Sequence, residues 1–130
     1  MVRVNEYLPM QRLPVLDPRR LADLGEELES HPGALSFLGS YLELLPDRLA
    51  SVSAAVRAGD EAAAMDRALS LKVTSTMVGA LQLAAVAEAL EPLVCAGDWN
   101  ALDGVLQDLA PAVAAVQKAG TAVVNGVLHP

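Results

Sequence analysis

A continuous stripe of leucine and valine between residues 35 and 56 places the strongest constraint on the fold. Its members follow one another at alternating steps of three and four residues, which puts them on one face of an α-helix: Leu35, Leu38, Leu42, Leu45, Leu49, Val52 and Val56. A coiled coil could bury this stripe, but the stripe is short and another helical pattern soon follows, so an intramolecular bundle is favoured. Pro46 lies inside the stripe and is expected to kink the helix or break it locally.

Short motifs that end or begin helices divide the rest of the chain into helical segments. Gly59-Asp60 and Gly97-Asp98 each combine a glycine that ends one helix with an aspartate that caps the next. Because these connections are short, the helices they join should be antiparallel neighbours. Asp17-Pro18 predicts a further helix start and His31-Pro32-Gly33 predicts a turn. Helices are expected from residue 18 to about 30, along the stripe, from 61 to about 78, on to 96, and through 102–116.

The composition agrees with a helical protein. Apolar residues make up 53% of the chain but aromatic residues only 3%, so the core must consist of leucine, valine and alanine. The length of 130 residues suits one domain with its own core. We expect an all-α fold, an up-down antiparallel four-helix bundle with an additional terminal helical segment. Residues 1–15 are interpreted as an N-terminal extension, 16–119 as the bundle and 120–130 as a C-terminal tail.

Charge and side-chain chemistry argue against several classes of function. The formal net charge is −7 and the nine lysines and arginines are dispersed, which disfavours nucleic-acid binding. Cys95 is a lone cysteine, and His31 and His129 lie far apart, so no metal or cofactor is expected. The sequence contains no recognisable acid–base pair or activated nucleophile, so it does not predict an enzyme. The sequence shows neither a signal peptide nor a membrane span, and it predicts a cytoplasmic protein that does not bind membranes.

A motif with a definite spacing lies between residues 68 and 80. It consists of an alanine, a Leu-Lys pair and a later Gly-Ala pair: Ala68, Leu71, Lys72, Gly79 and Ala80. With the surrounding helices, which cover most of the chain, it resembles the bacterial histidine phosphotransfer (HPt) domain family. That family's signature runs roughly Ala-His-x-Leu-Lys-Gly and then, after a few small residues, Gly-Ala. Leu69 stands at the position of the histidine, and Val73 stands at the position of the glycine after the lysine.

The resemblance implies a helical bundle that works in two-component phosphorelay signalling. In an active member an exposed imidazole accepts the phosphoryl group, the lysine neutralises its oxygens and the glycine leaves room for the partner. Leucine has no lone pair with which to accept phosphate. The resemblance therefore indicates a degenerate, pseudo-phosphotransfer protein that docks or sequesters a response-regulator receiver domain or a histidine kinase. The alternative is a structural helical bundle that homodimerises.

Helical spacing sorts the residues of the 61–78 helix onto two faces. The face expected toward the bundle is small and mostly apolar: Ala64, Ala68, Leu71, Ser75 and Val78. The other face is expected toward solvent and holds an apolar patch with a polar rim: Met65, Leu69 and Val73 in the patch, with Arg67, Lys72 and Thr76 around it. We predict that this patch docks a receiver-like domain or a second copy of the chain.

The exposure of Leu69 separates this prediction from a simpler one. If the helix is rotated or covered by the N-terminal segment, Leu69 belongs to the core and the docking surface disappears. Glu88 and Glu91 on the following helix could approach the Leu69 region, although carboxylates on a helix surface are most often only solvated.

Overall fold

Five α-helices make up most of residues 13–126, the part of the chain that this computed structural model describes. They are α3 (Pro18–Glu27), α4 (His31–Arg57), α5 (Glu61–Val78), α6 (Leu81–Ala96) and α7 (Trp99–Val124). None of these helices combines the length and the apolar character that crossing a membrane would require.

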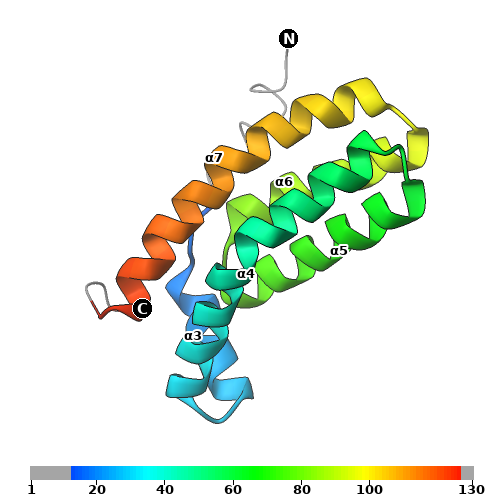
Figure 1. The fold of residues 1–130 in the computed structure, drawn as a ribbon. Coiled ribbons are helices and arrows are strands. Elements are labelled where there is room, and N and C mark those ends of the chain that lie inside the picture. The colour runs from blue at the N-terminus through cyan, green and yellow to red at the C-terminus, as the bar shows by residue number, and fades with distance from the viewer. Residues whose placement is uncertain (1–12, 127–130) are drawn as a thin grey trace.

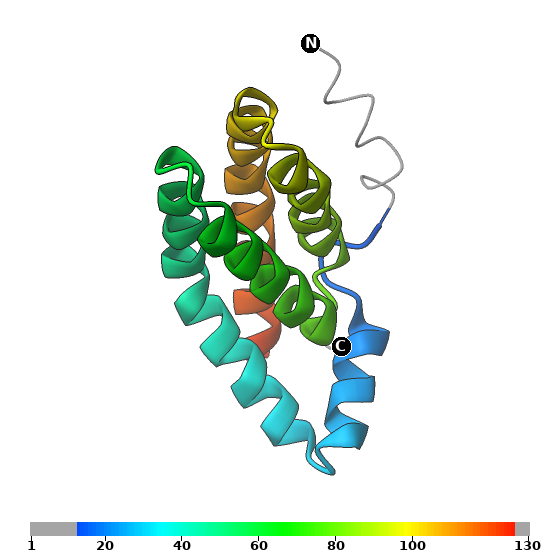
Figure 2. The same cartoon turned by 90° about the vertical axis from the view of Figure 1, so that its right-hand side faces the viewer.

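Helices α4 to α7 form an antiparallel bundle (Figure 1). Each packs against the next along the chain, and α7 returns to pack against α4, which closes the bundle. The shorter α3 lies at one end, beside the first turns of α4, and also contacts α5 (Figure 2). The expected all-α, up-down four-helix bundle with an additional terminal segment is thus confirmed, and α3 is that segment.

The apolar stripe of α4 faces the inside of the bundle, as its spacing predicts. Leu38, Leu45 and Val52 are almost completely buried, while Leu35 and Leu49 at the edges of the stripe are half-buried. The other helices add leucine, valine and alanine to the same core. Burial of apolar area is the main stabilising contribution in a core of this kind.

Both glycine–aspartate pairs end one helix and begin the next, as predicted. Gly59 and Gly97 have φ values of +65° and +67°, a left-handed conformation that glycine adopts without steric cost. The Asp60 and Asp98 carboxylates each accept a hydrogen bond from the backbone N–H three residues further on, at 3.1 and 3.2 Å. These local signals set one end of each of the four bundle helices.

The turn between α3 and α4 corrects one prediction. His31-Pro32-Gly33 does not form a turn, because these residues make the first turn of α4. The helix α3 already ends at Glu27, and Glu29 reverses the chain with a φ of +54°. Ser30 caps α4 by accepting a hydrogen bond from the Gly33 N–H at 2.9 Å. A proline in the first turn lacks only an N–H that would be unpaired there, so the serine cap overrides the proline signal.

The prolines inside the longer helices do not interrupt them. α4 continues across Pro46, so the local break that was one of the two expected outcomes does not occur, and α7 continues across Pro111. α7 also runs on to Val124, past the expected start of the tail at residue 120. Gly120 is buried there, and a Cβ at that position would lie 2.7 Å from Leu42 Cδ2. The last turns of α7 are therefore held by close packing against α4 rather than by local helix signals.

A non-helical segment, residues 13–17, lies against the connection between α5 and α6. The Asp17 N–H donates to the Gly79 carbonyl at 2.8 Å, and the Gln82 N–H donates to the Pro14 carbonyl at 3.2 Å. Gly79 ends α5 with a φ of +89°. A Cβ on Gly79 would lie 2.6 Å from the Asp17 carbonyl oxygen. Glycine is therefore required at this position both by its backbone conformation and by the close approach of the segment.

Gly79→Ala should destabilise the protein more than the same change at Gly97. Both substitutions place a side chain at positive φ, which costs about 1–2 kcal/mol. Gly97 has no neighbouring atom within 4 Å of its hypothetical Cβ, so it isolates this conformational cost. Gly79→Ala also forces residues 13–17 to move, which should add at least about 1 kcal/mol. Urea unfolding measures both losses, and equal losses would contradict the packing role of Gly79.

One buried polar contact links α4 to α5. The hydroxyl groups of Tyr41 and Ser75 form a hydrogen bond of 2.7 Å, and both side chains are buried. Burial raises the pKa of Tyr41 to about 12, an effect that the hydrogen bond to Ser75 and the charge of Arg48 partly offset. The neutral phenol is thus the form that the folded protein favours.

Alkaline pH should reveal the burial of the Tyr41 phenol as a loss of stability. The pKa of Tyr41 lies near its ordinary value of 10.0 in the unfolded chain but near 12 in the folded protein, so unfolding releases a proton between these pH values. The stabilising contribution is complete below pH 10 and declines toward pH 12, by about 2–3 kcal/mol in all. Tyr41→Phe lacks the phenol and should lose this part of the pH dependence. Urea unfolding measures the free energy of unfolding of both proteins between pH 10 and pH 12. If the difference between the two free energies did not change with pH, the prediction would be wrong.

Candidate functional site

The two faces of α5 are sorted as the spacing predicts. The face toward the bundle is buried and contains the five expected residues: Ala64, Ala68, Leu71, Ser75 and Val78. On the opposite face Leu69 is 38% exposed, so it is not a core residue. The alternative in which α5 is rotated and Leu69 is buried is therefore wrong.

An apolar ridge runs along the outward face of α5. It consists of Leu69, Val73 and Met77, which lie on successive turns and are 38%, 52% and 40% exposed. Met65, which was expected in the patch, is half-buried and packs against the core. Met77 was not predicted, although it continues the four-residue spacing of Leu69 and Val73 and could have been found from that pattern. We call these three exposed residues the α5 ridge.

Lys72 lies on the flank of the ridge that faces α6. Its Nζ is 2.9 Å from Glu91 Oε2, and both side chains are about three-quarters shielded from solvent. The hydrogen bond to Glu91 raises the pKa of Lys72 above its ordinary value. Burial partly opposes this effect, and the charges of Glu91 and Glu88 add to it. Glu91 thus approaches the Leu69 region, as the sequence suggested, and it pairs with the one lysine of the motif.

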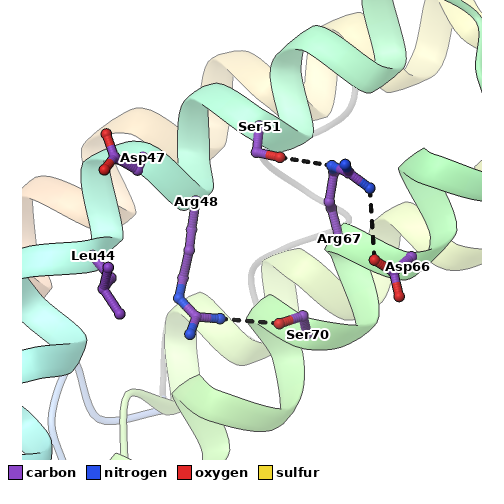
Figure 3. A pocket seen from close by; sticks show the side chains of 7 residues that line it. All are labelled: Leu44, Asp47, Arg48, Ser51, Asp66, Arg67 and Ser70. Carbon is purple, nitrogen blue, oxygen red and sulfur yellow. Dashed lines mark hydrogen bonds and ion pairs between the residues drawn. The ribbon is translucent and has the colours of Figure 1, made fainter.

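Arg67 lies on the opposite flank, which faces α4. Its Nε donates to the Ser51 hydroxyl at 2.6 Å. A second arginine, Arg48 of α4, reaches across in the other direction and donates to the Ser70 hydroxyl at 3.0 Å (Figure 3). Between them is a groove of about 390 Å³. The predicted rim of the patch is therefore split, with Arg67 on one side of α5 and Lys72 and Thr76 on the other.

Two threonine hydroxyls lie near Leu69, and the histidines of the chain lie elsewhere in the sequence. Thr76 donates back to the Lys72 carbonyl at 2.8 Å, and Thr74 donates to the Ser70 carbonyl at 2.8 Å, so both hydroxyls are engaged by their own helix. His31 lies at the start of α4, next to Gly25 of α3, and His129 is outside the described residues. Across residues 13–126 no cluster of histidine, cysteine, aspartate and glutamate could hold a metal ion.

Comparison with known proteins identifies the fold family. The family model described as "Hpt domain" matches residues 36–119, which is more than half of the chain. The chain belongs to the Hpt domain family.

Two solved structures resemble this Hpt domain over nearly their whole length. Histidine-containing phosphotransfer protein B (HptB) from Pseudomonas aeruginosa PAO1 is 28% identical, with a TM-score of 0.78, covering 86% of this chain and 96% of that one. The HPT domain from a sensor hybrid histidine kinase of Shewanella is 17% identical, with a TM-score of 0.72, covering 89% and 97%. The second likeness concerns the fold alone. No curated protein sequence gives a significant match.

Four residues of the Hpt motif are buried and serve the scaffold. Ala68 and Leu71 lie in the core face of α5, and Gly79 and Ala80 form its connection to α6. Leu69 follows Ala68 in the sequence, but its side chain points outward.

Glu91→Gln should lower the pKa of Lys72, because it removes the contact that raises that pKa most. Glu88→Gln should lower it less, since Glu88 contributes the smallest of the three effects that raise it. NMR titration of the lysine side chains measures the pKa of Lys72 in each variant. Lys118, the other lysine of the chain, serves as an internal reference.

The sign of the pH effect follows from the raised pKa. The charged lysine is favoured in the folded state, so the stabilisation from the pair is present below the ordinary lysine range and is lost as the pH rises above it. Equal pKa values of Lys72 in the wild type and in Glu91→Gln would exclude the pairing.

Proposed function

We propose that this Hpt-family chain acts in two-component phosphorelay signalling as a docking partner that does not itself carry phosphate. The observation that carries the proposal is Leu69. It stands in the motif where the family resemblance gives a histidine, and its side chain is exposed on the outward face of α5. The surface that would present an imidazole to a partner presents hydrocarbon instead.

The chemistry around Leu69 supports the loss of phosphoryl acceptance. Phosphoryl transfer needs a positioned nucleophile and positive charge to neutralise the oxygens of the transferred group. Leu69 supplies no nucleophile, and the ammonium group of Lys72 is already neutralised by Glu91 at 2.9 Å. Val73 is half exposed where the family signature has a glycine, so it adds bulk in front of an incoming partner.

Docking remains possible without the histidine. The α5 ridge is an exposed apolar strip on the bundle surface, and such strips commonly mark protein–protein contacts. The partner would be a response-regulator receiver domain or a histidine kinase of the phosphorelay. By occupying it, the chain would sequester the partner or compete with an active Hpt domain. In this role the chain is a cytoplasmic binding protein without cofactor and not an enzyme.

A homodimer through the same ridge is the second candidate function. It is favoured by the three large apolar side chains that the ridge leaves exposed, since two copies could cover them reciprocally. Molecular mass measured over a concentration series separates the two, because self-association depends on the chain's own concentration. A monomer at all concentrations would leave the receiver or kinase as the occupant of the ridge.

The central test is incubation with phosphorylated receiver domains from the same organism, read for both complex formation and transfer of the label. We expect a complex with at least one receiver and no stable label on the chain. An Hpt domain that has its histidine serves as the positive control. Acid-labile phosphate on the wild-type chain would refute the docking-only proposal.

Restoring the motif should restore phosphate acceptance. Leu69→His with Val73→Gly supplies the nucleophile and removes the bulk beside it, so this variant should accept label from a phosphorylated receiver. Adding Glu91→Gln frees Lys72 and should increase the rate of acceptance further. Leu28→His, at an exposed leucine outside the site, is the matched control and should take up no label. Failure of the triple variant to accept label from a receiver that it binds would mean that the scaffold itself is unsuited to transfer.

A further inference from the structure

The groove between α4 and α5 contains two guanidinium groups from opposite walls. Arg48 enters from α4 and Arg67 enters from α5, and each reaches across toward the other helix (Figure 3). We call it the guanidinium groove and define it by the residues that line it: Leu44, Asp47, Arg48, Ser51, Asp66, Arg67 and Ser70.

The partners of Arg48 are neutral. Its Nη1 donates to the hydroxyls of Ser70 at 3.0 Å and Thr74 at 3.4 Å, and among residues 13–126 no carboxylate forms an ion pair with it. Asp47 is its neighbour in the sequence but turns away from the guanidinium (Figure 3). A guanidinium has five N–H donors, so most of the capacity of Arg48 remains for a further acceptor.

Arg67 has a close neutral partner in Ser51 but only a weak ion pair. Besides the Ser51 hydroxyl and the Ala63 carbonyl at 3.4 Å, its charged neighbour is Asp66, at 3.6 Å and 79% exposed. An exposed ion pair at this distance contributes little and is screened by solvent. Two guanidinium groups that share a groove without a firm carboxylate partner form a site for an anion, and the planar donor fork matches a carboxylate.

The donor geometry, rather than the net charge, suits a carboxylate. Asp47 and Asp66 leave the lining with a formal charge of zero, two arginines against two aspartates. Attraction by the arginines and repulsion by the aspartates both scale with the charge of a ligand, so charge alone does not distinguish a carboxylate from a phosphate. The planar fork of a guanidinium pairs with a carboxylate in two parallel hydrogen bonds, and a docked protein offers carboxylates on its side chains. The groove therefore suits the side chain of an aspartate or glutamate of a docked protein.

The groove adjoins the surface proposed to dock the partner. Ser70, one of the lining residues, directly follows Leu69 of the α5 ridge in the helix, and Leu44, another lining residue, is 47% exposed. A partner that covers the ridge would therefore also cover the groove. On the other flank of α5 the charge of Lys72 is already neutralised by Glu91, so the guanidinium groove is the side on which a partner's acidic group would gain a new contact.

We infer that the guanidinium groove receives a carboxylate side chain of the docked receiver domain and so selects receivers that carry an acidic residue beside the surface that meets the α5 ridge. This inference rests on the proposed docking function, and it names the part of the interface that determines specificity. The ridge contributes buried apolar area, and the groove contributes orientation and discrimination between partners.

The test compares two double variants that change the net charge equally. Arg48→Ala with Arg67→Ala empties the groove, while Arg19→Ala with Arg57→Ala removes two exposed arginines elsewhere on the surface. For the receiver that binds wild type, the groove variant should raise Kd about tenfold or more, the effect of losing one hydrogen bond to a charged group. Its affinity should also depend less on salt concentration. The control should change Kd less than about threefold.

A third variant keeps the test informative if the alanine variant does not fold. Arg48→Lys with Arg67→Lys keeps both charges but removes the planar forks, so it should give an intermediate Kd with the salt dependence of wild type. Circular dichroism and thermal unfolding show whether each of the three variants is folded. The lysine variant decides the outcome if the alanine variant is unfolded.

The possible failures are distinguishable. If the groove and control variants weaken binding equally, or if neither weakens it, the groove inference is wrong while the docking function stands. If no receiver binds the wild-type chain, the docking function is wrong and the groove inference falls with it.

Discussion

The burial of one narrow face of α5 determines the rest of the functional surface. Ala64 and Ala68 allow close approach to the neighbouring helices, and Ser75 completes that face by bonding to the Tyr41 hydroxyl. With this face fixed in the bundle, the rotation of α5 is fixed as well. Leu69 must then point outward, because it lies on the opposite side of a helix whose other side is already occupied.

Local signals explain why most of the fold could be predicted from the sequence. Two kinds of signal act between residues close in sequence: the leucine and valine stripe of α4, and the boundaries at Gly59-Asp60 and Gly97-Asp98. They can therefore be recognised without tertiary information. The predictions failed where two local signals competed or where packing decided. The Ser30 cap overrode the proline signal at the start of α4, and the fit of Gly120 against Leu42 extended α7.

The site was predicted in its composition but less well in its arrangement. Helical spacing alone places Arg67 and Lys72 about 140° apart around α5, so they lie on opposite flanks of the patch. Their partners could not be derived from spacing, because they lie on other helices: Ser51 on α4 and Glu91 on α6. Met77 is a different case, since the four-residue series that includes Leu69 and Val73 already leads to it.

The contact of Gly79 with residues 13–17 bears on how such chains are recognised. Gly79 stands in the family signature, yet its role here is to admit a neighbouring backbone segment, a need that persists whether or not phosphate is ever carried. Positions of this kind establish family membership without reporting on the reaction. Under the function proposed above, the identity of the outward residue at position 69 decides whether a chain with this architecture carries phosphate.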